Sequence, residues 1–127
     1  MFEVNPDIVC RLIELAREFH AQEEVVFPEV NGNPSGDWAT QMLANHAEDM
    51  TFQEFRSIIS DLDPDQQQQI VALLWTGRGD YSLEEWDDAL AQAIDDWTPN
   101  TAEYLIVHPM LAEYLIEGLE QFDHSCD

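Results

Sequence analysis

Helix-start signals recur along this chain, and they constrain its fold more than any other feature of the sequence. Three dipeptides join a helix-capping residue to a proline suited to the first helical turn: Asn5-Pro6, Asp63-Pro64 and Thr98-Pro99. Two further pairs have the spacing of a capping box: Thr51 with Glu54, and Ser82 with Glu85. Strand signals are nearly absent, with one candidate at residues 25–27. The sequence therefore predicts an all-α protein.

Apolar residues follow each of these signals at offsets of three and four, which is typical of a helix that buries one face. The first predicted helix runs from Pro6 to about Glu24, and the second from Trp38 toward Asp49. Further helices follow the other caps, and Pro109 separates the last two. Six or seven short helices with short connections predict a compact orthogonal bundle. We expect the bundle to bury most of three indoles: Trp75, Trp86 and Trp97.

The chain has 127 residues, which is the size of one domain, so we predict a single helical domain over 1–127. The hydrophobic fraction of 45% is enough to fill its core. Two prolines and two glycines fall within residues 25–37, so this segment is predicted to be the one long loop. The glutamine run at 66–69 is expected to face solvent.

Acidic residues dominate the charge of the chain. Aspartate and glutamate number 27 against four basic residues, all of them arginine, and the formal net charge is −23. This balance excludes a protein that binds nucleic acid by neutralising phosphates, and it excludes a polybasic contact with a membrane. It favours a partner with a basic face, because opposite charge speeds such an encounter.

The cysteines and the first twenty residues bear on the compartment. Residues 1–20 lack the basic-then-apolar layout of a signal peptide, and no apolar run has the length needed to cross a bilayer. We therefore predict a cytoplasmic protein. Cys10 and Cys126 lie near opposite ends of the chain, and we favour two reduced thiols over a disulfide that joins the ends.

The segment from Leu74 to Glu85 has part of the pattern of an EF-hand loop. With Glu85 at the twelfth position, Gly79 falls on the sixth, where that loop must turn. Arg78 then occupies the fifth position, where calcium needs an oxygen ligand, so we do not predict calcium binding. The chain contains no motif for a metal, a cofactor or a catalytic nucleophile, and we predict none of them. An enzymatic function is open on this evidence, and we favour a protein that is not an enzyme.

Arg78 is the last basic residue of the chain, and thirteen acids follow it. We expect Gly77 to end the preceding helix, and Arg78 to form an ion pair with Asp80, Glu84 or Glu85. The alternative is that Arg78 binds an anionic ligand, which the surrounding negative charge opposes.

A family resemblance extends from about Phe52 to Leu119. It rests on Leu73-Leu-Trp-Thr-Gly-Arg-Gly-Asp80, Glu85-Trp86, Thr101-Ala-Glu-Tyr-Leu105 and Pro109-Met-Leu-Ala-Glu-Tyr-Leu115. These residues resemble a bacterial family of uncharacterised proteins, domain of unknown function 3775. The resemblance implies a bacterial origin and a helical domain, and it implies no activity. It draws attention to four residues as one candidate functional or structural cluster: Trp75, Arg78, Asp80 and Trp86.

Two classes of function follow. The leading one is a non-enzymatic acidic module that binds a basic protein, with nucleic-acid mimicry as its sharper version. The alternative is a ligand-binding or enzymatic helical domain with a site near Arg78. Adaptation to a saline cytoplasm is a third explanation of the same acidity. The sequence favours neither mimicry nor salt adaptation, and it does not indicate an oligomeric state.

Overall fold

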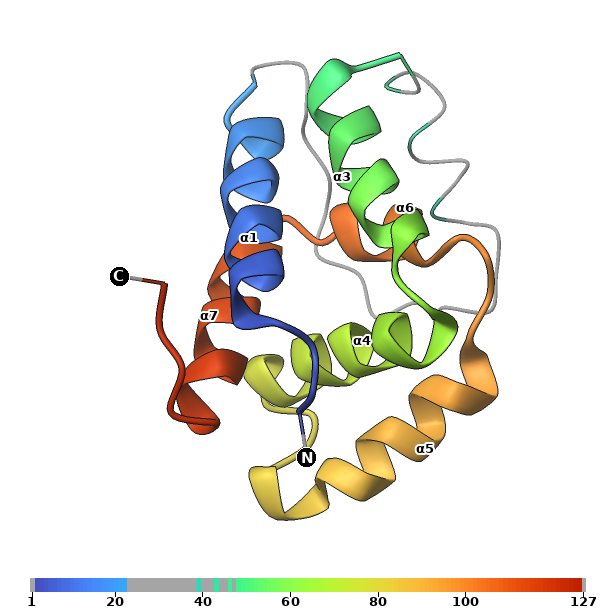
Figure 1. Ribbon diagram of the computed structural model, residues 1–127. Coiled ribbons are helices and arrows are strands. Elements are labelled where there is room, and N and C mark those ends of the chain that lie inside the picture. The colour runs from blue at the N-terminus through green and yellow to red at the C-terminus, as the bar shows by residue number, and fades with distance from the viewer. Residues whose placement is uncertain (1, 23–38, 40–42, 44–45, 47, 127) are drawn as a thin grey trace.

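The computed structural model describes residues 2–22, 39, 43, 46 and 48–126, and these form helices and no β-strand (Figure 1). The elements are α1 (Pro6–His20), α3 (Met50–Asp61), α4 (Pro64–Arg78), the 3-10 helix η2 (Leu83–Glu85), α5 (Trp86–Asp96), α6 (Thr101–Ile106) and α7 (Leu111–Gln121). The all-α prediction is confirmed for this part of the chain. The predicted loop at 25–37 lies outside the described residues, as do the candidate strand and most of the helix predicted from Trp38.

Helix α4 is the centre of the bundle. It packs against α5, α6 and α7, while α1 packs against α3 and α7. Figure 1 shows α4 crossing below α1 and α3, with α5 along the outer edge of the molecule. Every residue of α4 from Ile70 to Thr76 is buried, because neighbouring helices cover it on several sides.

The helix starts agree with the predicted caps, with two corrections. Helix α6 begins at Thr101 after Asn100, rather than at Pro99 after Thr98. Asn5, Asp63 and Ser82 precede α1, α4 and η2 as predicted. The cap of α3 is Asp49 rather than Thr51, because the Asp49 side chain accepts a hydrogen bond of 3.0 Å from the Phe52 amide. A carboxylate two positions earlier satisfies the same free amides, so the helix begins at Met50.

The helix ends differ from the predictions. Helix α1 ends at His20, not near Glu24. Helix α4 continues through Gly77 to Arg78, and Gly79 is the cap, with a φ of 96° that an L side chain rarely adopts. Gly77 has another reason to be glycine, since a Cβ atom there would lie 1.7 Å from the Tyr114 carbonyl oxygen of α7.

The indoles are placed much as expected, and two glutamines are not. Trp75 and Trp86 are 6% and 3% exposed, and Trp97 is half-buried. Gln67 and Gln69 are buried, which corrects the prediction of a solvated run. Gln67 accepts a hydrogen bond of 2.9 Å from the Trp97 indole and donates to two main-chain carbonyls, so its burial leaves no polar atom without a partner.

The cysteines are joined, so the prediction of two reduced thiols is wrong. Cys10 of α1 and Cys126, after α7, form a disulfide with their Cα atoms 5.6 Å apart. They are 116 positions apart in sequence, and they meet because α1 packs against α7 and the residues after α7 return beside α1. Among the described residues, none of the helices is both long and apolar enough to span a bilayer.

Candidate functional site

The ion pair expected at Arg78 is present at the C-terminal end of α4. The Arg78 Nε and Nη2 atoms donate to one oxygen of Asp80, at 2.8 and 2.6 Å. The Arg78 side chain is 13% exposed, and that of Asp80 is 45% exposed. Burial opposes the charge of Arg78, but the hydrogen bond and the charge of Asp80 raise its pKa above the usual value. The charged guanidinium therefore closes the turn that follows α4.

Tyr104, which the sequence did not single out, connects Trp75 with this ion pair. The Trp75 indole donates a hydrogen bond of 2.9 Å to the Tyr104 hydroxyl. Burial raises the pKa of Tyr104, while the bond from Trp75 and the charge of Arg78 oppose that rise. Three of the four predicted cluster residues, Trp75, Arg78 and Asp80, thus belong to one arrangement around the buried Tyr104, with Asp80 at its exposed edge.

Trp86, the fourth predicted residue, packs elsewhere. Its ring lies 4.9 Å from that of Phe122 and 6.1 Å from that of Phe2, measured between centroids. These contacts join the first residues of the chain to the end of α7 and the start of α5. The predicted cluster therefore comprises two separate arrangements, one around Tyr104 and one around Trp86.

His108 adds an unusual buried group beside Tyr104. It is fully buried, and its Nδ1 atom lies 2.8 Å from the Tyr104 carbonyl oxygen, to which it donates. Its Nε2 atom has no hydrogen-bond partner, and neither has the Arg78 Nη1 atom. Burial, together with the charge of Arg78, lowers the pKa of His108 to about 4. Its position just before Pro109 was the one sequence signal that could have drawn attention to it.

Acidification is expected to destabilise the fold through His108. Above about pH 6.5 this residue is neutral in both the folded and unfolded states, and it adds no pH dependence. Between about pH 6.5 and 4, His108 binds a proton in the unfolded chain but not in the folded protein. The free energy of unfolding therefore falls as the pH falls. The loss approaches about 3 kcal/mol below pH 4, at about 1.4 kcal/mol per pKa unit.

Urea unfolding at a series of pH values measures this effect. In His108→Asn the amide still donates to the Tyr104 carbonyl but does not titrate, so its stability should fall less between pH 6.5 and 4. His124→Gln, which alters a half-buried histidine near the C-terminus, is the control and should keep the wild-type profile. Identical profiles for wild type and His108→Asn would contradict this account.

Glu85, placed at the calcium-ligand position of the EF-hand pattern, has a different role. Its carboxylate accepts a hydrogen bond of 2.9 Å from the Ser82 amide, and the two residues form the predicted capping box of η2. The helix–loop–helix joint is thus held by caps on both sides, Gly79 before it and Ser82 after it.

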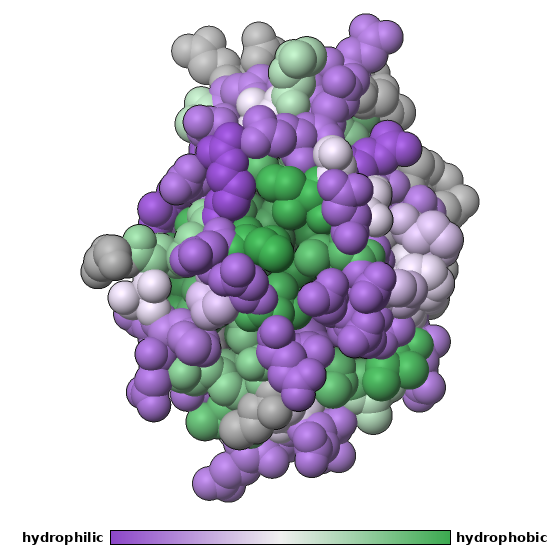
Figure 2. All heavy atoms as spheres, viewed as in Figure 1, coloured by the Kyte–Doolittle hydropathy of each residue, from purple (hydrophilic) through white to green (hydrophobic). Residues whose placement is uncertain are grey.

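Few acids have a cationic partner. Within the described part of the chain the ion pairs are Arg11 with Glu14, Arg11 with Glu54, and Arg78 with Asp80. Hydrophilic side chains cover most of the face shown in Figure 2, and apolar side chains are visible near its middle. Carboxylates on the remaining surface are therefore available to a partner.

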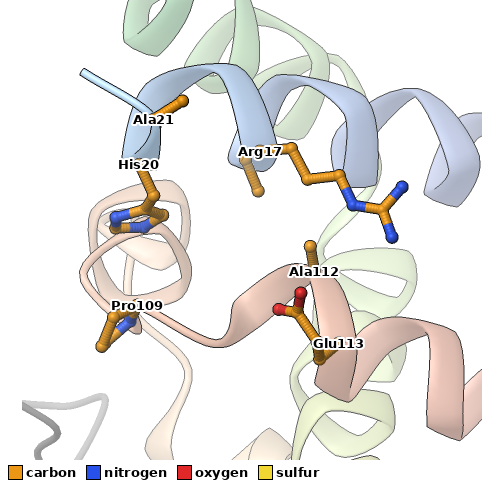
Figure 3. Close-up of a pocket in the computed structure, with 7 residues that line it drawn as sticks. Arg17, His20, Ala21, Pro109, Ala112 and Glu113 are labelled. Atoms are coloured by element: carbon orange, nitrogen blue, oxygen red, sulfur yellow. The ribbon is translucent and has the colours of Figure 1, made fainter.

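Two cavities lie between α1 and α7, with volumes of about 220 and 150 Å³, and Arg17 lines both of them. Figure 3 shows the larger one, with His20 and Pro109 at one end and Glu113 at the other. The sequence analysis did not identify this site, because its residues come from helices about ninety positions apart.

Comparison with known proteins places the chain. A family described as "Protein of unknown function (DUF3775)" matches residues 52–124, which is more than half of the chain. No curated protein and no solved structure shows detectable similarity to it. The match includes α4, the ion pair at Arg78 and all of the elements that follow. The chain therefore belongs to the DUF3775 family.

Proposed function

We propose that this protein is a non-enzymatic acidic module that binds a basic, amphipathic protein segment through the outward face of α5. Residues 83–96, which form η2 and α5, contain six acids and no basic residue. Of the helices, α5 packs chiefly against α4, and it lies at the edge of the bundle (Figure 1). Residues 87, 88, 91, 92, 94 and 95 are exposed, so this outward face is open to a partner.

Ile94 carries the proposal. Its side chain is 52% exposed, and the half-buried Leu90 lies one turn earlier on α5. Asp87, Asp88 and Asp95 are exposed on the solvent side of these two residues, and none of them forms an ion pair with an arginine within the described part of the chain. An apolar strip bordered by unpaired carboxylates is complementary to a helix with leucines on one side and lysines or arginines on the other.

The ligand-binding alternative near Arg78 receives less support, because two of its nitrogen atoms already bind Asp80. Mimicry of nucleic acid remains the special case in which the basic partner itself binds DNA. A cytoplasmic location, which the sequence predicts, would require the Cys10–Cys126 disulfide to persist against cellular reductants.

Fluorescence anisotropy with a labelled, synthetic, basic amphipathic helix tests the proposal. The triple variant Asp87→Asn/Asp88→Asn/Asp95→Asn should weaken binding at least tenfold, about 1.4 kcal/mol. Ile94→Ser should also weaken it. The matched control removes three exposed carboxylates from other helices, in Glu18→Gln/Asp61→Asn/Glu117→Gln, and should change the affinity less than about threefold.

The control separates a docking surface from the overall negative charge. Both triple variants change the net charge equally, so the general field weakens equally in both. If the two variants lose the same affinity, the α5 face is not the binding surface. If the peptide binds duplex DNA, and that DNA does not displace this protein from the peptide, mimicry is excluded while the protein interaction stands.

A further inference from the structure

The residues that line the two cavities follow one another along α1 and α7. The larger is lined in part by Arg17, His20, Pro109, Ala112 and Glu113. The smaller is lined in part by Ile13, Arg17, Ile116, Leu119 and Glu120. Arg17 therefore stands where the cavities adjoin, with small residues on one side of it and aliphatic side chains on the other.

Arg17 is exposed and takes part in none of the ion pairs of the described residues. Arg56 is likewise exposed and outside those ion pairs, so Arg17 is distinguished by its place in the lining of both cavities. Glu113 lines the larger cavity together with Arg17, but the guanidinium of Arg17 points away from the Glu113 carboxylate in Figure 3, and the two residues form no ion pair. A cation and an anion thus line the same cavity without pairing.

The charges along the two cavities alternate. Glu113 lines the larger cavity, Arg17 lines both, and Glu120 lines the smaller one. Glu113 and Glu120 are seven residues apart on α7, so they share one face at a rise of about 10 Å. Hydrogen bonds of about 3 Å to each carboxylate would leave several ångströms between two cationic groups of one ligand.

We propose that these cavities bind a free basic α-amino acid of the lysine, ornithine or arginine class. The α-carboxylate would pair with Arg17, the α-ammonium with Glu113 and the side-chain cation with Glu120. The methylene groups would lie against Ile13 and Ile116, which line the smaller cavity. This ligand matches the alternation of charge, and its net charge of +1 suits the acidic field.

Other small ligands match the charges less well. A dianion would be repelled by the field and by both glutamates. A diamine would leave Arg17 beside two cationic groups, and a neutral aliphatic amino acid would leave Glu120 without a partner. His20 adds no opposing charge at neutral pH, because burial lowers its pKa. Its hydrogen bond of 2.7 Å to the Ile106 carbonyl oxygen and the charge of Glu113 oppose that shift without reversing it.

Titration calorimetry of the full chain with L-lysine at about 0.15 M salt tests the proposal, because exposed charges are then screened within about 8 Å. We expect saturable binding with a Kd of about 1 mM or tighter. Three analogues each lack one charged group, and each should bind at least about tenfold more weakly. Cadaverine lacks the carboxylate, Nα-acetyl-L-lysine lacks the α-ammonium, and L-norleucine lacks the side-chain cation.

Arg17→Gln provides the sharpest comparison. It removes the partner of the carboxylate and a charge that repels amines, so the preference for L-lysine over cadaverine should fall at least about tenfold. Glu120→Gln should lower the affinity for L-lysine but not for L-norleucine. The controls Arg56→Gln and Glu117→Gln alter exposed residues that do not line either cavity, and they should preserve the preference.

Two results would overturn the proposal: no saturable binding of L-lysine, L-ornithine or L-arginine, or equal binding of cadaverine with no effect of Arg17→Gln. Neither result bears on the α5 surface, which lies on a different helix. Conversely, loss of peptide binding by the α5 variants would leave binding of the amino acid unchanged.

Discussion

Gly77→Ala is expected to destabilise the protein by at least about 3 kcal/mol, or to prevent folding altogether. A Cβ atom at this position would lie 1.7 Å from the carbonyl oxygen of Tyr114 and 2.7 Å from its carbonyl carbon. Both atoms belong to the main chain of α7, which no side-chain rotation can move aside. Helices α4 and α7 would have to separate, and the core between them would be lost.

The expected sign is opposite to that of helix propensity, which makes the test decisive. Within a helix, alanine is more favourable than glycine by about 1 kcal/mol, so without the close approach Gly77→Ala would stabilise α4. Gly118 marks the other side of the same contact, since a Cβ atom there would lie 2.8 Å from the Leu73 carbonyl oxygen.

Gly79→Ala is the matched control. A Cβ atom at Gly79 would meet nothing within 4 Å, so the cost comes from the φ of 96° alone and should be about 1–2 kcal/mol. Urea unfolding followed by far-ultraviolet circular dichroism gives both values. If Gly77→Ala is as stable as Gly79→Ala or more so, the helices do not approach each other as described.

Removal of the Cys10–Cys126 disulfide should have the second large effect. The disulfide closes a loop that spans nearly the entire chain, with a sequence separation of 116. Restricting an unfolded chain by a loop of this length is worth about 5 kcal/mol in the chain-entropy model, and measured values are typically about 2–4 kcal/mol. We therefore expect Cys10→Ser/Cys126→Ser to lose about 2–4 kcal/mol in urea unfolding.

Reductant provides the control for this prediction. Dithiothreitol should lower the stability of the wild type to about that of the double variant, and it should leave the double variant unchanged. A count of two free thiols in protein prepared without reductant would show that the cysteines are not joined. Equal stability of the oxidised wild type and the double variant would show that the disulfide does not contribute.

Local signals in the sequence predicted most of the helices. The caps at Asn5, Asp63 and Ser82 act on amides within the next turn, so their effect does not depend on the rest of the fold. The pair Arg78–Asp80 was predictable for the same reason, because the two residues are two positions apart and share one turn. Asp49 replaced Thr51 as a cap because two good capping residues compete within three positions.

Local signals of this kind could not predict contacts between helices that are distant in the sequence. His108 and Tyr104 are about thirty positions from Arg78 and come near it only because α6 packs against α4. Gln67 and Gln69 looked like solvated residues, and their burial depends on partners as distant as Trp97 and Glu3. A polar side chain can be buried wherever the fold provides partners for its hydrogen bonds. The local sequence does not show whether distant residues will provide those partners.

The sequence by itself determined the helical class, most of the helix starts and the excess of negative charge. Only the tertiary structure decided that Gly77 is a contact point, that Cys10 meets Cys126, and that Arg17 lines cavities with Glu113 and Glu120. The physical reason is that capping acts within one helical turn, whereas the distance between two helices is set by how their side chains pack.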